Sequence, residues 1–181
     1  MERKASALNY SRGKTTPPVS GKELISRDAL IAQLRADAQT RDLVLVVAPA
    51  GYGKTVLLTA LHETLCAAGA DVFWYNCDRT DVVPHKLAAF LREVSCAEDG
   101  LAGDDSLGLE ASAALLASLI GAGLEQRTAH STVIIENYHL AQSAETDALI
   151  EAVLAHESPY LHLVISSRVK PGFASRKLKL A

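Results

Sequence analysis

Residues 48–55, with the sequence APAGYGKT, combine side chains and backbone of the kind that bind phosphate groups. Gly51 and Gly53 let the backbone approach an anion closely and adopt turns that a Cβ would hinder. Lys54 is placed to reach the β- and γ-phosphates of a nucleotide, and the hydroxyl of Thr55 is placed to bind Mg²⁺. This stretch therefore predicts a phosphate-binding loop.

The first position of such a loop is usually Gly, and here it is Ala48. Ala is the smallest replacement, and this position begins the turn without supplying the cation or the metal ligand. The flanking sequence supports the interpretation, because the apolar run 43–47 predicts a buried strand and a helical pattern begins at Lys54. A strand, a tight turn and a helix N-terminus in that order favour an anion site over a Gly-rich turn with a solvated lysine.

Cleavage of a nucleotide needs further groups beside the phosphate loop. Residues 131–137, STVIIEN, predict a strand that ends in Glu136 and Asn137, where ligands bind in an open parallel sheet. Glu136 can hold Mg²⁺, whereas Asn137 can hydrogen-bond a water molecule but cannot take its proton at neutral pH. Arg168 ends a further strand, where it could sense the γ-phosphate or simply be a polar strand end.

Strands and helices alternate along the chain, as in an α/β fold with a parallel sheet and right-handed crossovers. We expect strands at 43–47, 71–76, 131–137 and 161–168, and helices at 25–39, 54–70, 85–94, 108–124 and 143–157. Together with the phosphate loop, this order predicts a three-layer P-loop NTPase domain with helices on both faces of the sheet.

Composition limits the other classes of function. The chain has 181 residues, 49% of them apolar, and a net charge of −3, which suggests one globular domain that does not bind polyanions as a whole. Its three cysteines form no CxxC pair, and its histidines, His139 included, have no metal-ligand spacing, so we expect neither a disulfide framework nor a zinc site. No window approaches the roughly 18 apolar residues of a membrane helix, so we expect a cytoplasmic protein with no membrane contact.

Two end segments differ from the expected domain, which we place at 21–170. Residues 1–20 are polar, carry basic side chains and end near a Pro-Pro pair, and we expect a flexible leader. Residues 171–181 are basic and contain no acid, and we expect the start of a further domain there, poorly ordered or irregularly docked in this chain.

Four blocks in this order resemble a known family. APAGYGKT, FWYNCD, IIENYHL and LHLVISSRVKP look like the nucleotide-binding domain of MalT-like, LuxR-type transcriptional regulators, which belong to the STAND class of signal-transducing P-loop ATPases. The resemblance runs from about Leu24 to about Leu180. Four blocks in order are far more specific than any one of them.

The resemblance implies ATP or ADP with Mg²⁺ as ligands and assigns roles to individual residues. The nucleotide contacts would be Ala50, Gly51, Tyr52, Gly53, Lys54, Thr55, Val56, Arg27 and Arg168, with Leu24 and Ile25 along the adenine. Lys54, Glu136 and Asn137 would be the catalytic set, and Thr55 and Glu136 the metal ligands. Ala48 is a common variant in this family, but the family usually has two Asp where this chain has Glu136 and Asn137, which puts hydrolysis in doubt more than binding.

The favoured hypothesis is an ATP-binding switch domain of a LuxR-type regulator, with weak or impaired hydrolysis. The resemblance implies self-association or contact with other domains of such a regulator, and DNA binding only through a domain absent from this chain. Two alternatives stay open. A small P-loop kinase of a metabolite suits the length, but residues 97–124 contain no Lys or Arg for a phosphate-binding lid. A pseudo-ATPase interaction module would bind no nucleotide.

Overall fold

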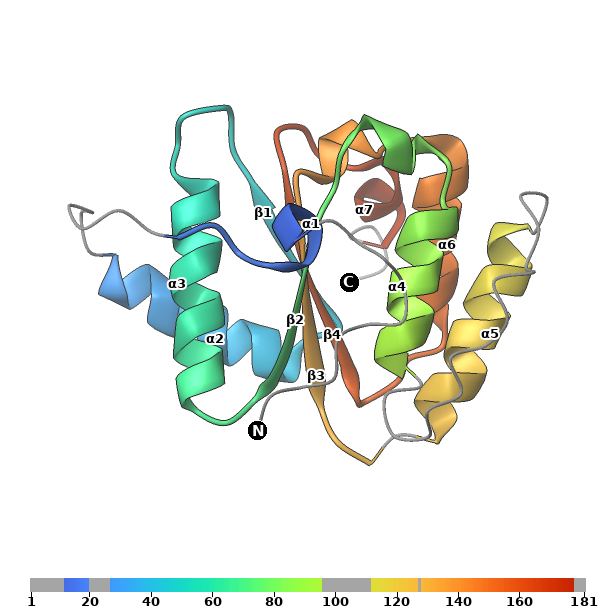
Figure 1. Ribbon diagram of the computed structural model, residues 1–181, viewed down its shortest axis with the longest axis horizontal. Helices are drawn as coiled ribbons and strands as arrows, with labels where there is room; N and C mark the ends of the chain where they lie inside the picture. Colours follow the sequence, from blue (N-terminus) through green and yellow to red (C-terminus); the bar gives the residue numbers. More distant parts are fainter. Residues whose placement is uncertain (1–11, 20–26, 96–111, 127, 178–181) are drawn as a thin grey trace.

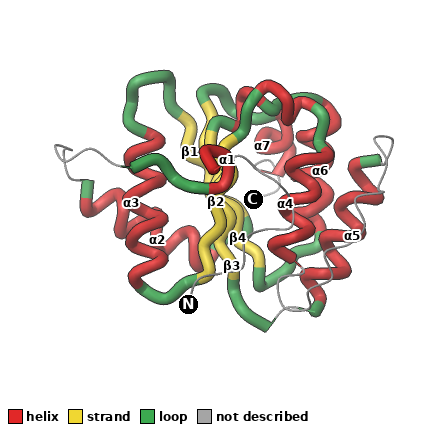
Figure 2. The backbone as a smooth tube through the Cα atoms, in the orientation of Figure 1, coloured by secondary structure: helices red, strands yellow, loops and turns green. Residues whose placement is uncertain are grey.

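Four parallel strands form the centre of the molecule (Figures 1 and 2). The computed structural model describes residues 12–19, 27–95, 112–126 and 128–177. The strands are β1 (Leu43–Val47), β2 (Asp71–Asn76), β3 (Ser131–Glu136) and β4 (Leu161–Ser167). They lie in the order β1-β4-β3-β2, so the strand before the phosphate loop pairs with the last strand of the chain.

Helices cover both faces of this sheet, as Figure 1 shows. On one face lie α2 (Asp28–Thr40) and α3 (Lys54–Ala67). On the other lie α4 (His85–Ser95) and α6 (Ala144–Ala155), with α5 (Ala113–Glu125) packed against both of these helices. The expected three-layer α/β arrangement is confirmed.

The register of the sheet explains why its strands are apolar on both faces. Neighbouring strands align Val44, Val164, Ile134 and Trp74 in one row, and these side chains pack with α2 and α3. The next row, which points to the opposite face because side chains alternate along a strand, contains Leu45, Ile165, Ile135 and Tyr75 and packs toward α4 and α6. Strands covered on both faces therefore read as continuous apolar runs.

Most expected elements are confirmed to within a few residues. The third strand ends at Glu136, one residue earlier than expected, because Asn137 adopts a left-handed conformation with φ 56°. The helix expected at 108–124 is observed as α5 from Ala113. Several other expectations lie outside the described residues: Leu24, Ile25, the loop at 97–108 and the end of the basic tail.

Part of the expected flexible leader is structured. Residues 12–15 form α1 (Arg12–Thr15), which packs against β2, and Lys14 is 8% exposed. The leader expectation is therefore corrected for these residues, because a lysine can be buried where carboxylates neutralise it, as Asp78 and Asp81 do here.

The first residues of the basic tail also dock in a regular way. Helix α7 (Gly172–Lys177) packs against α6, and the ring of Phe173 lies edge-on to Tyr138 at 5.5 Å between centroids. Phe173 is 1% exposed, so the burial of its ring holds α7 against the domain. The basic composition of this segment gave no sign of that apolar contact. In the part of the chain that the structure describes, no helix has both the length and the apolar character to cross a bilayer.

Candidate nucleotide site

The loop after β1 has the backbone conformation that an anion site requires. Gly51 and Gly53 adopt left-handed φ angles of 83° and 76°, which side chains with a Cβ rarely allow. Gly53 is also the N-cap of α3, so the unpaired N–H groups at the start of this helix face the turn. The helix dipole and these donors together favour a negatively charged ligand at this point.

Ala48 causes no conformational difficulty in this loop. Among the described residues, the non-glycine positions with positive φ are Asn137 and Glu157, so Ala48 needs no glycine-like freedom. Its backbone takes part instead: the N–H donates to the carbonyl of Ser167 at 3.3 Å, which joins the loop to the end of β4. The side chain at position 48 is therefore not what shapes the turn.

Lys54 is folded back over the loop. Its ammonium donates to the carbonyl oxygens of Ala48 at 2.6 Å and Pro49 at 2.9 Å. These two hydrogen bonds hold the ammonium beside the loop, where it would contact the terminal phosphates of a bound nucleotide. A bound phosphate would offer the ammonium stronger, charged acceptors than carbonyl oxygens.

Thr55, at the start of α3, contacts Glu136, at the end of β3. The hydroxyl of Thr55 donates to Oε1 of Glu136, which brings together the two oxygens predicted to hold Mg²⁺. Glu136 is 3% exposed, and burial raises the pKa of its carboxyl group while the Thr55 hydroxyl and the Lys54 cation lower it. A hydroxyl and a carboxylate that converge from two elements are ligands that suit Mg²⁺, so the residues present fit this ion.

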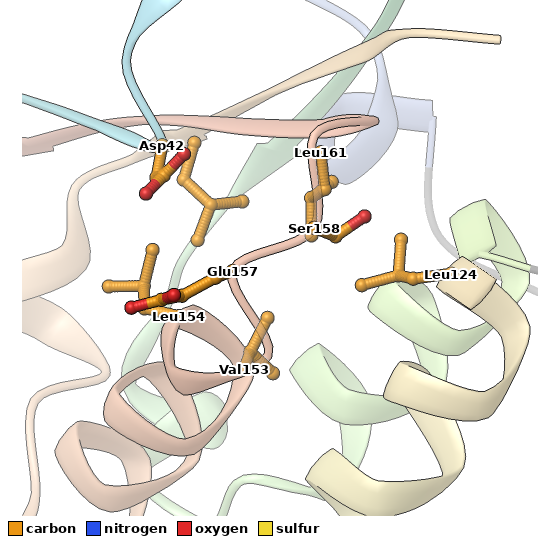
Figure 3. Close-up of a pocket in the computed structure, with 8 residues that line it drawn as sticks. Asp42, Leu124, Val153, Leu154, Glu157, Ser158 and Leu161 are labelled. Carbon is orange, nitrogen blue, oxygen red and sulfur yellow. The ribbon is translucent and has the colours of Figure 1, made fainter.

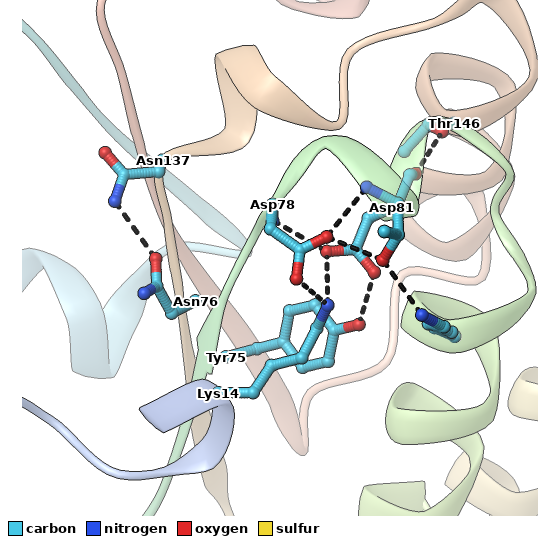
Figure 4. A network of polar contacts seen from close by, with 9 residues as sticks. Lys14, Tyr75, Asn76, Asp78, Asp81, Asn137 and Thr146 are labelled. Atoms are coloured by element: carbon cyan, nitrogen blue, oxygen red, sulfur yellow. Dashed lines mark hydrogen bonds and ion pairs between the residues drawn. The ribbon is translucent and has the colours of Figure 1, made fainter. Parts of the chain in front are cut away.

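Asn137 is held by two neighbouring strands (Figure 4). Its side-chain amide donates to Oδ1 of Asn76, at the end of β2, at 3.0 Å. Its backbone N–H donates to the hydroxyl of Ser166, on β4, at 3.2 Å. The predicted catalytic Asn137 therefore lies beside Glu136, but its amide is already engaged and has no basic group to take a proton.

His139, which has no metal-ligand spacing in the sequence, is influenced by the charges of two residues predicted to bind the nucleotide. Burial lowers the pKa of His139, and the positive charges of Arg168 and Lys54 lower it further. Neither ring nitrogen has a hydrogen-bond partner in the described part of the chain, although both are shielded from solvent. An imidazole with two unpaired, shielded nitrogens is a candidate ligand-contacting group. The sequence pattern does not reveal it, because His139 has no metal-ligand spacing.

Of the two predicted arginines, Arg27 has a direct contact with the loop and Arg168 lies at the end of β4. Arg27, just before α2, donates from Nη1 to the carbonyl of Tyr52 at 3.3 Å. Arg168 follows β4 directly and is exposed. Tyr52 and these two arginines are exposed. The roles predicted for these residues, and for Ala50 and Val56 on the same loop, remain predictions.

A hollow at the opposite end of the sheet has different chemistry (Figure 3). It lies near the start of β4 and the last turns of α5 and α6, and carries two acidic residues beside apolar ones. Its lining residues are Asp42, Leu124, Val153, Leu154, Glu157, Ser158, Leu161 and Leu163. Without a cation or a cluster of polar donors in this lining, the hollow offers nothing that would bind phosphate.

Comparison with curated proteins identifies relatives of this chain. The HTH-type transcriptional regulator MalT of Serratia proteamaculans (strain 568) is 29% identical over 172 residues. The serine/threonine-protein kinase PknK of Mycobacterium tuberculosis (strain ATCC 25618 / H37Rv) is 28% identical over 178 residues. Each match covers 92% of this chain but only 18% of MalT and 15% of PknK, so the chain spans less than a fifth of either relative. The resemblance to MalT-like proteins is confirmed.

Solved structures show the fold more widely. The Aeropyrum pernix ORC1 protein, solved in complex with DNA, superposes with a TM-score of 0.58 over 86% of this chain and 44% of its own, at 15% identity. A likeness at this identity shows the fold alone, and it agrees with the P-loop NTPase fold expected from the sequence. No protein-family model matches the chain.

Proposed function

We propose that this chain is the ATP-binding switch domain of a LuxR-type transcriptional regulator and that it hydrolyses ATP weakly. The observation that carries the proposal is the contact between Thr55 and Glu136, which joins the phosphate loop to the end of β3. This contact brings the N-terminus of α3, Lys54 and two oxygen atoms together at the carboxyl ends of the strands. The similarity to MalT supports the regulatory context.

Each group in the site would make a separate contribution to binding. The N–H groups at the start of α3 and the ammonium of Lys54 would bind the phosphates, and Arg27 and Tyr52 would flank the nucleotide on the exposed side of the loop. Thr55 and Glu136 would hold Mg²⁺, which neutralises charge on the phosphate oxygens when bound. Arg168 and His139 would distinguish ATP from ADP by contact with the γ-phosphate.

The residues at 136 and 137 support the proposal of weak hydrolysis. Glu136 accepts the Thr55 hydroxyl and would hold the metal, so it is not free to take a proton from water. Asn137 donates its amide to Asn76 and has no basic atom to replace a carboxylate. The nucleotide would therefore act chiefly as a ligand that shifts a conformational equilibrium by its different affinity for two states.

The wider role would need segments beyond this chain. We place the protein in the cytoplasm, where ATP and Mg²⁺ are available, and assign it self-association or contact with other domains of the regulator. DNA would be bound by a separate domain. A kinase of small metabolites receives no support from the described residues of α5, which contain no Lys or Arg.

Calorimetric titration of the purified chain with Mg-ATP and Mg-ADP tests this proposal directly. We expect saturable binding of both, and a loss of affinity of about 30-fold or more in Lys54→Ala, because truncating one partner of a desolvated charge pair is costly. The control is Arg41→Ala, which removes a basic side chain that pairs with Asp37 at the C-terminal end of α2, away from the loop. If the folded wild-type chain bound neither nucleotide, the pseudo-ATPase alternative would replace this proposal.

A further inference from the structure

A lysine of the leader is buried in a cluster of carboxylates at the far edge of the sheet (Figure 4). The ammonium of Lys14 lies 2.7 Å from Oδ2 of Asp78 and 2.8 Å from Oδ2 of Asp81. It also lies 5.3 Å from the centre of the Tyr75 ring, within the range of a cation–π contact. Lys14 comes from α1 and the other three residues from the end of β2 and the turn that follows it, so this contact joins segments more than sixty positions apart in the chain.

The buried carboxylate of this cluster, that of Asp81, requires the lysine, whereas the side chain of Asp78 is 53% exposed. Asp81 is fully buried, and its two oxygens accept the Tyr75 hydroxyl and the Asp78 N–H, each at 2.8 Å. These neutral donors do not cancel its charge, and Asp78 places a second carboxylate beside the same ammonium. A buried carboxylate without a cation is strongly unfavourable, so Lys14 is what allows this turn to carry two acids.

The turn held by Lys14 is connected to the segment that follows Glu136. This turn is the 3₁₀ helix η1 (Arg79–Val82), and a second 3₁₀ helix, η2 (Tyr138–Leu140), contacts it. The carbonyl of Val82 accepts the hydroxyl of Ser143 at 2.8 Å and that of Thr146 at 3.2 Å, both at the start of α6. Residues 137–143 are therefore fastened to η1 at their C-terminal end.

The same segment is fastened at its other end to the strand that leads into η1. Asn137 donates to Asn76, the last residue of β2, and Cys77 donates its N–H to the carbonyl of Glu136 at 2.9 Å. Asp78 follows at once. One continuous stretch, 76–82, thus contacts Lys14 on one side and the residues next to the nucleotide site on the other.

We propose that Lys14 is a positioning residue for the nucleotide site: it fixes η1, and η1 fixes the segment 137–146 that places Asn137 and His139. The expected effect on nucleotide affinity rests on the proposed function, but the expected ordering of residues 137–146 by Lys14 does not. Lys14 itself touches no nucleotide group. Its removal should loosen 137–146 and leave the phosphate loop in place. The loop follows β1, the outer strand on the opposite side of the sheet from β2.

Hydrogen exchange of the full chain measures this coupling. In Lys14→Met, which keeps most of the stem and removes the charge, we expect amide exchange in 137–147 to rise about tenfold, with exchange in the first turns of α3 unchanged. Suitable probes are the amides of Leu140, Ala141 and Thr146, which donate to Asn137, Tyr138 and Ser143. Lys14→Arg keeps the charge and should restore protection.

Two further variants complete the test. Arg41→Met removes an ion pair of the same type, with Asp37 at 2.7 Å, from the exposed end of α2, and it should leave 137–147 unchanged. Asp78→Asn weakens the Lys14–Asp78 ion pair by changing the acid instead of the lysine. The Asn can still cap η1 but carries no charge. This variant should raise exchange in 137–147 by a smaller factor, and it answers the question even if Lys14→Met fails to fold.

Nucleotide titration separates this inference from the proposed function. If the wild type binds, we expect Lys14→Met to lose about tenfold in affinity for Mg-ATP and less than about twofold for Mg-ADP, since on the proposed function Asn137 and His139 would lie beside the terminal phosphate. Equal losses for both nucleotides, or unchanged exchange in 137–147 in Lys14→Met or Asp78→Asn, would overturn the role of Lys14. A wild type that binds neither nucleotide would refute the proposed function alone, and the exchange result would still decide the coupling.

Discussion

The phosphate loop and the strand end at Glu136 both lie at the carboxyl ends of the parallel strands, but they are built in different ways. The loop is a run of consecutive residues whose shape comes from two glycines and whose cation, Lys54, bonds to carbonyls five and six positions earlier. The region around Glu136 and Asn137 is assembled from β2, β3, β4 and, through η1, the leader. One half of the site is therefore local and the other depends on the tertiary structure.

This difference bears on the proposed division between nucleotide binding and hydrolysis. The loop carries the groups that would bind phosphate, namely the backbone N–H donors at the start of α3 and the adjacent side chains of Lys54 and Thr55. At the strand end, both predicted catalytic side chains already have partners: Glu136 accepts from Thr55 of the loop, and Asn137 donates to Asn76. This arrangement supports the proposed switch more than a rapid ATPase.

The largest expected effect comes from changing the chemistry of the tertiary half. The double variant Glu136→Asp, Asn137→Asp supplies a second carboxylate, and we expect ATP turnover to rise at least about tenfold, since a positioned general base contributes roughly 10²–10⁴. Asp tolerates the left-handed conformation at position 137 nearly as well as Asn. Steady-state phosphate release is the measurement, and a rate equal to that of the wild type would contradict the role assigned to these residues.

A second variant pair changes the local half alone. Gly53→Ala and Gly69→Ala each place a Cβ on a residue with φ near 76–79°, and each should lower stability by about 1–2 kcal/mol. Only Gly53 lies at the start of α3 beside Arg27, so only its variant should also weaken Mg-ADP binding, by about fivefold. Thermal unfolding and calorimetry give the two quantities. Equal nucleotide affinity in both variants would show that the turn at Gly53 is not a phosphate contact.

The leader contact predicts a specific acid sensitivity. Hydrogen bonds from Lys14 and Thr80 lower the pKa of Asp78 from 3.8 to about 2. Because the folded-state pKa is depressed, the carboxylate stabilises the fold above pH 3.8, and this contribution is lost as the pH falls toward about 2. Denaturant unfolding of wild type and Asp78→Asn should therefore show a stability difference that shrinks over this range. A constant difference would mean that Lys14 does not stabilise the ionised form of Asp78.

The smallest effect is expected at the position that departs from the usual loop pattern. Ala48→Gly should change nucleotide affinity by less than about twofold, because residue 48 contributes through its backbone N–H and carbonyl. Its stability should fall by about 0.4–1 kcal/mol, since Gly adds freedom to the unfolded chain. A large gain in affinity on calorimetry would show that Ala48 does impair the loop after all.

The sequence by itself determined the elements and the local half of the site. Apolar runs of strand length and helical spacing place β1, β2, β3 and β4 within one residue, because buried parallel strands carry side chains on both faces. The glycines, Lys54 and Thr55 are neighbours in the chain, so the predicted phosphate site can be read from consecutive residues. The resemblance to MalT-like proteins added the context, and the comparisons confirm it.

Only the tertiary structure decided how the distant parts meet. The order β1-β4-β3-β2 brings Ser166 to Asn137 and Asn76 to the same strand end, and no spacing along the chain encodes those contacts. Lys14 looked like one basic residue in a polar leader, because its burial depends on two carboxylates that only the fold places beside it. His139 has no partner pattern in the sequence, and its place near Lys54 and Arg168 follows from the packing of η2 against β4. Backbone preferences act between neighbours in the chain, whereas charge pairing and burial act between neighbours in space.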